Sequence, residues 1–282
     1  MILAVLMGPY AAFLTMASIL TVQALFFADG GLLALGCNIF NLGFFPCFIV
    51  YPFIYKKIVG DEPTQGRIMS GALLSGILAL QMGAFGVVLE TLFSGISELP
   101  FHTFVLLMQP IHLAIGIVEG FVTAAVVTFV WKARPEILEL AAVSKSAEHP
   151  SFKNILAGLL VVTVITGGML SWFASADPDG LEWSMSRTSG KEELAAPSHR
   201  LHSFLATLQE KIAFLPDYGF KSSEKKESAA SGGEEKQSEA TKEEPWPAVS
   251  AGTTLSGLIG GIVTMVVAGL IGFGLRRYRR PG

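Results

Sequence analysis

Apolar residues are grouped in long runs along this chain, and polar residues fill the short connections between them. Each run is long enough to cross a hydrocarbon layer of about 30 Å as a helix, which rises about 1.5 Å per residue. A membrane-spanning segment must also satisfy its own backbone hydrogen bonds, which favours helices throughout. The pattern therefore predicts an all-α integral membrane protein with about six transmembrane helices, over residues 1–28, 31–55, 68–93, 101–131, 154–174 and 254–275.

The pattern also divides the chain into two blocks. Residues 1–140 hold four runs, which we interpret as a transmembrane permease domain. Residues 150–282 hold two runs separated by a large polar insertion, 175–253, which contains an expected helix at 199–214. Within that insertion, residues 221–247 are rich in Lys, Glu, Ser, Ala and Gly, a composition that predicts a flexible tether.

Lys and Arg residues predict the orientation. They flank the second, fourth, fifth and sixth runs in such a way that all can lie on the cytoplasmic side, as the positive-inside rule requires. These residues are Lys56, Lys57, Arg67, Lys132, Arg134, Lys145, Lys153, Arg276, Arg277, Arg279 and Arg280. We therefore expect a multi-pass protein of a prokaryotic cytoplasmic membrane, with the turn at Asp29 and the whole of 175–253 outside the cell.

Composition narrows the function. Only 15% of the residues are charged and 51% are hydrophobic, which is unlike a soluble domain. The net charge of −3 and the absence of a basic face argue against nucleic acid as a partner. No P-loop or hydrolase motif occurs, so an enzyme is not expected. Cys37 and Cys47 would lie about 15 Å apart on one helix, too far to bridge, and we interpret them as buried apolar residues.

Polar side chains at membrane depth are candidate functional residues because burying them in lipid is costly. Gln23, Asp29, Asn38 and Asn41 cluster around the first outward turn, and Glu90 lies near the outer end of the third run. For the two asparagines we favour hydrogen bonds between helices or to groups that orient a metal ligand.

His112 and Glu119 are seven residues apart, and so on one face of a helix. They either act in transport or hold the bundle together, and both interpretations stay open. In the last run Gly257 and Gly261 form a GxxxG, which permits close helix packing.

Two of these segments resemble a known family. "GPYAAFLTMASILTVQALFFADGGLLALGCNIFNLG" (8–43) and "QPIHLAIGIVEGFVTAAVV" (109–127) are similar to the CbiM/NikM proteins, the substrate-specific membrane components of energy-coupling-factor (ECF) transporters for cobalt and nickel. "DPDGLEWS" (177–184) resembles the PDGLE domain, which is related to the small CbiN/NikN component, and "LPDYGF" (215–220) is similar to a later signature of that domain. The order is that of natural fusions of the two components.

The resemblance implies a metal site that this chain does not contain. In the family the ion is held by the N-terminal amine, a histidine at the second position and a later histidine. This chain begins Met1-Ile2, and its similarity starts inside what would be the third family helix. We therefore expect the primary ligands upstream of Met1, in a gene whose start has been placed too late, with a decayed copy as the alternative. Asn38, Asn41, His112 and Glu119 match family-typical positions and are expected to support the ligands or the helix packing.

The PDGLE-type run is expected to begin the outward loop. Pro178 and Gly180 would end the preceding helix and turn the chain. Asp177, Asp179 and Glu182, like Asp29, would then face outside, where they could collect a divalent cation weakly. Carboxylates suit Mg²⁺ or Ca²⁺ better than Ni²⁺ or Co²⁺, so we favour a structural and docking role.

The resemblance implies the substrate-capture component of an ECF transporter that imports Ni²⁺ or Co²⁺, without a cofactor of its own. Its partners would be the transmembrane coupling component and separate ATP-binding subunits. The alternative is a membrane adaptor that regulates a metal transporter through its external domain without transporting. The sequence does not choose between nickel and cobalt, since both accept nitrogen-rich sites.

Overall fold

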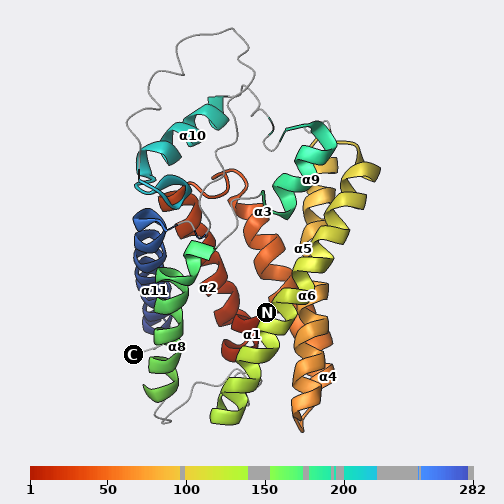
Figure 1. Cartoon of the computed structure of the whole chain (residues 1–282), viewed down its shortest axis with the longest axis vertical. Coiled ribbons are helices and arrows are strands. Elements are labelled where there is room, and N and C mark those ends of the chain that lie inside the picture. The colour runs from red at the N-terminus through yellow and green to blue at the C-terminus, as the bar shows by residue number, and fades with distance from the viewer. Residues whose placement is uncertain are drawn as a thin grey trace.

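The computed structural model describes residues 1–95, 99–138, 153–173, 178–191, 194, 200–220, 247 and 249–278. Within these ranges every regular element is a helix, and the long helices run side by side to form a bundle (Figure 1). The all-α class expected from the hydrophobic runs is confirmed.

The first run forms three consecutive helical pieces. α1 (Ile2–Met7) ends at Gly8, whose φ of 77° breaks the helix, and Pro9 then occupies the first turn of α2 (Pro9–Val22). α2 continues into the π-helical turn η1 (Gln23–Phe27), which ends where Ala28 adopts a left-handed conformation. The expected interruption at Gly8-Pro9 is confirmed.

The second, third and fourth runs complete the first block. The second run is α3 (Leu35–Ile39), the π-helical η2 (Phe40–Tyr55) and α4 (Lys56–Val59). α5 (Gln65–Ser94) and α6 (Phe101–Ala133) follow as a hairpin. They approach closely because neither has a side chain at the crossing: a Cβ on Gly76 would lie 2.8 Å from the Cα of Gly120.

The second block contributes two long helices and an outer layer. α8 (Lys153–Gly168) is followed by the short 3₁₀ turn η3 (Leu170–Phe173), and α11 (Ala251–Tyr278) packs against α8 and α2. Between them lie α9 (Gly180–Ser189), α10 (Arg200–Ile212) and the turn η4 (Pro216–Tyr218). The helix expected at 199–214 is thus α10. Most of the tether expected at 221–247 lies outside the described residues.

Five helices among the described residues are long and apolar enough to span a membrane: Pro9–Phe27, Leu35–Val59, Gln65–Ser94, Phe101–Ala133 and Ala251–Leu275. The run at 154–174, expected as a sixth, falls short, because its apolar α-helix covers only Leu156–Gly168. The α-helix stops at the Gly167-Gly168 pair because glycine is a poor helix former, and the chain continues as the 3₁₀ helix η3.

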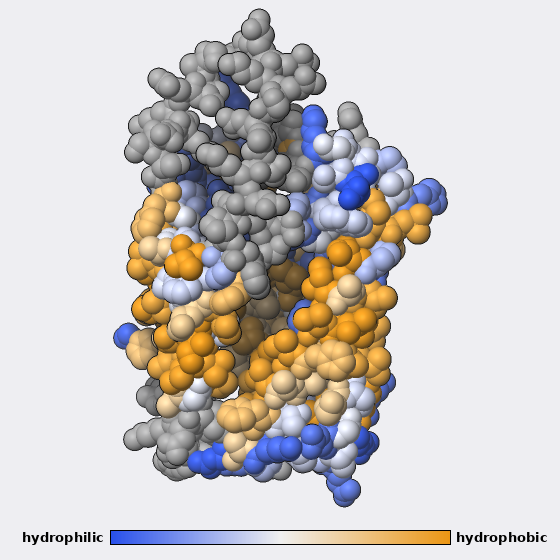
Figure 2. Space-filling view, in the orientation of Figure 1, coloured by the Kyte–Doolittle hydropathy of each residue, from blue (hydrophilic) through white to orange (hydrophobic). Residues whose placement is uncertain are grey.

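The outer surface of the bundle is that of a membrane protein. Figure 2 shows hydrophobic residues in a broad band over the middle of the molecule, with hydrophilic residues along the lower edge and at the upper right. Large apolar side chains of the span Phe101–Ala133 are exposed, for example Leu106 at 71% and Val118 at 64%. Such surface is stable against lipid and would be a large apolar patch in water.

Only one glycine of the GxxxG in α11 lies at a helix contact. A Cβ on Gly257 would lie 2.6 Å from the carbonyl oxygen of Gly167 on α8, whereas Gly261 has no neighbouring atom within 4 Å. We expect Gly257→Ala to push α11 away from α8 and to destabilise the protein by about 1–3 kcal/mol, the usual range for overpacking. Thermal unfolding of the purified variants measures this, with Gly261→Ala as the matched control on the same helix. Equal melting of the two variants would contradict the described α8–α11 contact.

Candidate functional site

The first polar contact near the outer ends of the helices joins η2 to α5. Asn41, only 3% exposed, donates its side-chain N–H to Glu90 Oε2 at 2.8 Å. Cys37, one helical turn earlier, is exposed and not buried as expected, whereas Cys47 is buried. Asn41 Oδ1 is buried without a hydrogen-bond partner, and it packs against α5 where Gly86 leaves room, since a Cβ there would lie 2.2 Å away. Asn41 is therefore held in one position by both a bond and a tight fit.

Asn38 occupies a different place. Its side-chain nitrogen lies beside the turn between η1 and α3, 2.9 Å from where a Cβ on Gly30 would be. Gly30 has a φ of +69°, so glycine is required there both for the backbone conformation and for space. The two asparagines of the "NIFN" segment thus contact different elements of the bundle.

The second polar contact connects the two blocks of the chain. The Tyr218 hydroxyl donates to the Asp29 carboxylate. The Gln23 side chain donates to both partners, at 3.2 Å to Asp29 Oδ2 and 3.2 Å to the Tyr218 oxygen. Burial of the ring, together with the bond to Asp29, raises the pKa of Tyr218 above its ordinary value, so its hydroxyl keeps the proton that it donates.

Further bonds fix the segment around Tyr218 on the outer end of η1. Gln209 donates to the carbonyls of Ala24 and Gly30, at 3.0 and 2.7 Å, and the Leu215 N–H donates to the Phe26 carbonyl at 3.3 Å. The Tyr218 ring stacks on Phe27 at 5.1 Å between centroids. We call this set of contacts between residues 23–30 and residues 209–220 the outer junction.

The outer junction also concentrates backbone strain. Among the described residues, positive φ values outside glycine occur at Ala28, Asp217 and Tyr218, with φ of 56°, 50° and 58°. All three flank or form the Asp29–Tyr218 contact. Such conformations persist where surrounding contacts hold them, and they occur frequently at functional sites.

The PDGLE-type run begins a helix. Asp179 caps α9 by accepting from the N–H groups of Leu181 and Glu182, both at 2.8 Å, and the Glu182 carboxylate accepts in return from the Asp179 N–H at 3.1 Å. The expectation that Pro178 and Gly180 end the preceding helix is wrong, because α8 already ends at Gly168 and these two residues instead precede and open α9. Asp177 lies outside the described residues.

α9 packs on the outer part of the α5–α6 hairpin. Leu181 and Met185 contact a buried cluster that includes Val88, Phe104 and Met108. Gly180 lies over His112 on α6, where a Cβ would be 3.0 Å from the imidazole Cε1. The glycine of the PDGLE-type run is therefore the residue that lets α9 approach His112.

His112 and Glu119 do not form a pair. The His112 Nδ1 is bonded to the Met108 carbonyl at 2.8 Å, whereas Glu119 Oε1 lies 3.8 Å from the Met1 amino nitrogen. Within the part of the chain that the structure describes, no group of three or more His, Cys, Asp or Glu side chains is arranged to hold a metal ion.

Each of the two blocks of the chain matches a known protein family model. The family model described as "Cobalt uptake substrate-specific transmembrane region" (CbiM) matches residues 1–137, and the PDGLE domain model matches residues 153–277. The chain is a CbiM/NikM-like fused protein. The outer junction thus joins the CbiM-like region, through Asp29, to the PDGLE domain, through Tyr218.

The relatives of this CbiM/NikM-like protein are named as metal transport proteins. A putative fused nickel transport protein NikMN of Archaeoglobus fulgidus is 31% identical over 166 residues, which are 56% of this chain and 50% of the relative. A cobalt transport protein CbiM of Sorangium cellulosum is 30% identical over 156 residues, 52% of this chain and 66% of the relative. A fused NikMN of Rhodobacter capsulatus is 29% identical over 154 residues, 49% of this chain and 43% of the relative. The matched part thus spans between 43% and 66% of these relatives, and no solved structure matches the chain.

The sequence did not predict which residues of the second block contact the turn at Asp29. Gln23 and Asp29 were expected at the outward turn, but Tyr218 and Gln209 were not assigned to it. The signal was the "LPDYGF" segment, whose tyrosine, proline and glycine suggest a defined turn with one large side chain, although the sequence does not say what that side chain contacts.

Proposed function

We propose that this chain is the substrate-capture component of an ECF transporter that carries Ni²⁺ or Co²⁺ across the cytoplasmic membrane. The observation that carries the proposal is the presence, in one chain and in the fused order, of a CbiM-like region and a PDGLE domain. The names of the relatives support a role in nickel or cobalt transport. A coupling protein and ATP-binding subunits would supply the energy.

The packing of the two regions supports a division of labour in which the PDGLE domain acts on the outer face of the CbiM-like region. Its described outer segments are attached at two separate places, α9 on the α5–α6 hairpin at His112 and residues 209–220 on η1 at Asp29. Both places lie near helix ends of the CbiM-like region that we assign to the outside, where metal ions arrive.

In this proposal Asn38, Asn41, His112 and Glu119 hold helices and turns in place rather than binding the ion directly. Asn38, Asn41 and His112 each have a neighbour within the protein that accounts for their position: Gly30, Glu90 and Gly180 respectively. Asp179 and Glu182 likewise direct their carboxylates at the α9 backbone, so their proposed role is docking.

The proposed orientation predicts which cysteines react from outside the cell. In a variant with Cys37 and Cys47 replaced by alanine, Ser203→Cys on α10 should label with a membrane-impermeant maleimide in intact cells. Glu62→Cys, in the exposed connection before α5, should label only after the cells are broken. Both positions are exposed, so accessibility within the protein does not limit labelling. The reverse pattern would place residues 175–253 in the cytoplasm and contradict the orientation.

Uptake of radioactive ⁶³Ni²⁺ or ⁵⁷Co²⁺ tests the transport function. The gene at its natural length is expressed with candidate coupling and ATP-binding subunits in a host without its own nickel and cobalt importers. Transport predicts accumulation well above that of cells lacking this gene. A complex that forms without accumulation would instead identify a regulatory adaptor.

A further inference from the structure

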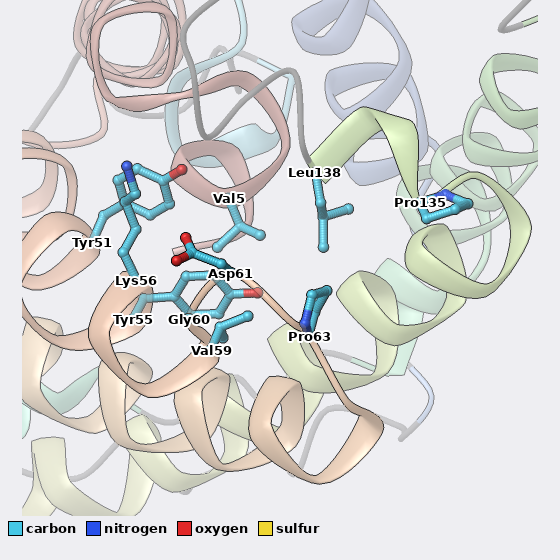
Figure 3. Close-up of a pocket in the computed structure, with 10 residues that line it drawn as sticks. All are labelled: Val5, Tyr51, Tyr55, Lys56, Val59, Gly60, Asp61, Pro63, Pro135 and Leu138. Carbon is cyan, nitrogen blue, oxygen red and sulfur yellow. The ribbon is translucent and has the colours of Figure 1, made fainter.

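A cavity lies at the opposite end of the bundle from the outer junction. It has a volume of about 310 Å³ and is bounded by α1, the end of η2 with α4, the connection to α5, and the segment after α6 (Figure 3). It is lined by Val5, Tyr51, Tyr55, Lys56, Val59, Gly60, Asp61, Pro63, Pro135 and Leu138. None of the contacts described above for the outer face uses these side chains.

The cavity contains a buried hydroxyl that the protein does not satisfy. Tyr55 is 4% exposed, and its hydroxyl oxygen has no hydrogen-bond partner. In Figure 3 the ring lies across one side of the cavity, and the hydroxyl points toward Pro63. A buried hydroxyl without a partner is unfavourable, and neighbouring Val59 and Pro63 have no side-chain group to accept its proton. The position therefore favours a bound molecule that presents a hydrogen-bond acceptor.

The charged residues of the lining are of opposite sign. Lys56 supplies an ammonium group and Asp61 a carboxylate, and in Figure 3 the Asp61 carboxylate lies on the side of the cavity occupied by Tyr51 and Lys56. A phosphate group suits the tyrosine hydroxyl and the lysine, since both donate to anions. A primary ammonium group suits the aspartate, because it both carries positive charge and donates hydrogen bonds.

The position of the cavity suggests where such a molecule comes from. Lys56 and Lys57 mark the end of the span Leu35–Val59, and Pro135 follows the span Phe101–Ala133. The cavity therefore lies at the level of lipid headgroups on the face that bears these lysines. Apart from Tyr51, its remaining side chains are apolar, among them Val5, Val59 and Leu138, which suits the glycerol and first acyl carbons of a lipid.

From this cavity we infer a binding site for a phospholipid whose headgroup carries both a phosphate and a primary amine, of the phosphoethanolamine type. The phosphate accepts from the Tyr55 hydroxyl within the field of Lys56, and the amine donates to Asp61. A glycerol headgroup leaves Asp61 beside an anion, and a choline headgroup has no N–H to donate. Selectivity for the amine thus resides in Asp61, and binding of the phosphate in Tyr55.

Native mass spectrometry of the purified protein, equilibrated with equal amounts of phosphatidylethanolamine, phosphatidylglycerol and phosphatidylcholine, tests the site. We expect one retained lipid, mainly phosphatidylethanolamine. In Tyr55→Phe the amount of that adduct should fall at least about fivefold, which corresponds to the loss of one hydrogen bond of roughly 1 kcal/mol. Asp61→Asn should retain lipid but lose the preference over phosphatidylglycerol. Tyr10→Phe, which changes a ring exposed at 70% elsewhere on the bundle, should behave as the unaltered protein does.

Three outcomes would overturn the site. Equal adducts of the three lipids, or an unchanged adduct in Tyr55→Phe, would mean that water satisfies the hydroxyl and that no headgroup is recognised. Displacement of the adduct by an equal concentration of soluble glycerophosphoethanolamine would identify a soluble phosphoamine as the ligand instead of a lipid. In protein freed of bound lipid, Tyr55→Phe removes only an unsatisfied hydroxyl, so its melting temperature should not fall, and this measurement separates loss of the site from loss of the fold.

Discussion

Tyr218→Phe is expected to lower metal uptake about tenfold without lowering the amount of protein in the membrane. The substitution keeps the ring that stacks on Phe27 but removes the only group that the Tyr218 side chain offers to Asp29. A hydrogen bond to a charged group contributes about 1.5–3 kcal/mol, enough to reduce the equilibrium constant for docking of residues 209–220 by about tenfold or more. The strained conformations of Asp217 and Tyr218 add to this effect, because they favour release.

The matched control is Tyr10→Phe. Its ring packs on Phe48 at 5.6 Å, and phenylalanine preserves that contact. Uptake in cells containing equal amounts of each variant is the measurement. If Tyr218→Phe and Tyr10→Phe both transport as the unaltered protein does, docking of the PDGLE domain at Asp29 is not required for transport.

Gly86→Ala is expected to have the largest effect on stability. The added Cβ would lie 2.2 Å from Asn41 Oδ1, so the Asn41 side chain must move and its bond to Glu90 breaks. Overpacking costs about 1–3 kcal/mol, and a carboxylate left without its donor adds about 1–3 kcal/mol. Thermal unfolding of the purified protein measures the sum.

Two further variants make this result specific. Gly66→Ala is the control on the same helix, since Gly66 has no neighbouring atom within 4 Å. The double variant Gly86→Ala with Asn41→Ala removes the clash, so it should be more stable than Gly86→Ala alone. If the second substitution instead adds to the loss, the fit between Asn41 and Gly86 is not the cause.

The fold was predictable because each membrane span is a long run of apolar residues, which can be recognised without knowing what the helix contacts. Each long apolar run became helical, and the break at Gly8-Pro9 followed from glycine and proline alone. The run at 154–174 was overestimated because hydropathy does not reveal where the Gly167-Gly168 pair ends the α-helix. Composition thus predicted the all-α class, whereas the helix ends depended on individual glycine and proline residues.

The direction of the turn at Pro178 and Gly180 was misjudged for a different reason. Proline and glycine are found at both ends of helices, so their presence does not say which end is meant. The decisive signal was the spacing of Asp179 and Glu182, which is that of a capping box and favours a helix start.

The partners in the candidate site were not predictable from the sequence. Asp29 and Tyr218 are separated by 189 positions, and Asn41 and Glu90 by 49. Periodicity places each residue on a helix or in a turn, but which distant side chain it meets depends on how the helices pack. His112 shows the same limit: it is bonded to the Met108 carbonyl and not to Glu119, because sharing a helix face does not bring two side chains seven positions apart into contact.

Metal transport by a defined complex is the most direct test of the proposed function. The protein at its natural length is purified with its coupling and ATP-binding subunits, reconstituted into liposomes, and supplied with ⁶³Ni²⁺ or ⁵⁷Co²⁺ on the side that bears residues 175–253 and ATP on the other. We expect ATP-dependent accumulation of at least one of the two ions, lost when this chain is omitted and reduced about tenfold by Tyr218→Phe. Accumulation that is the same with and without this chain would contradict its assignment as the substrate-capture component.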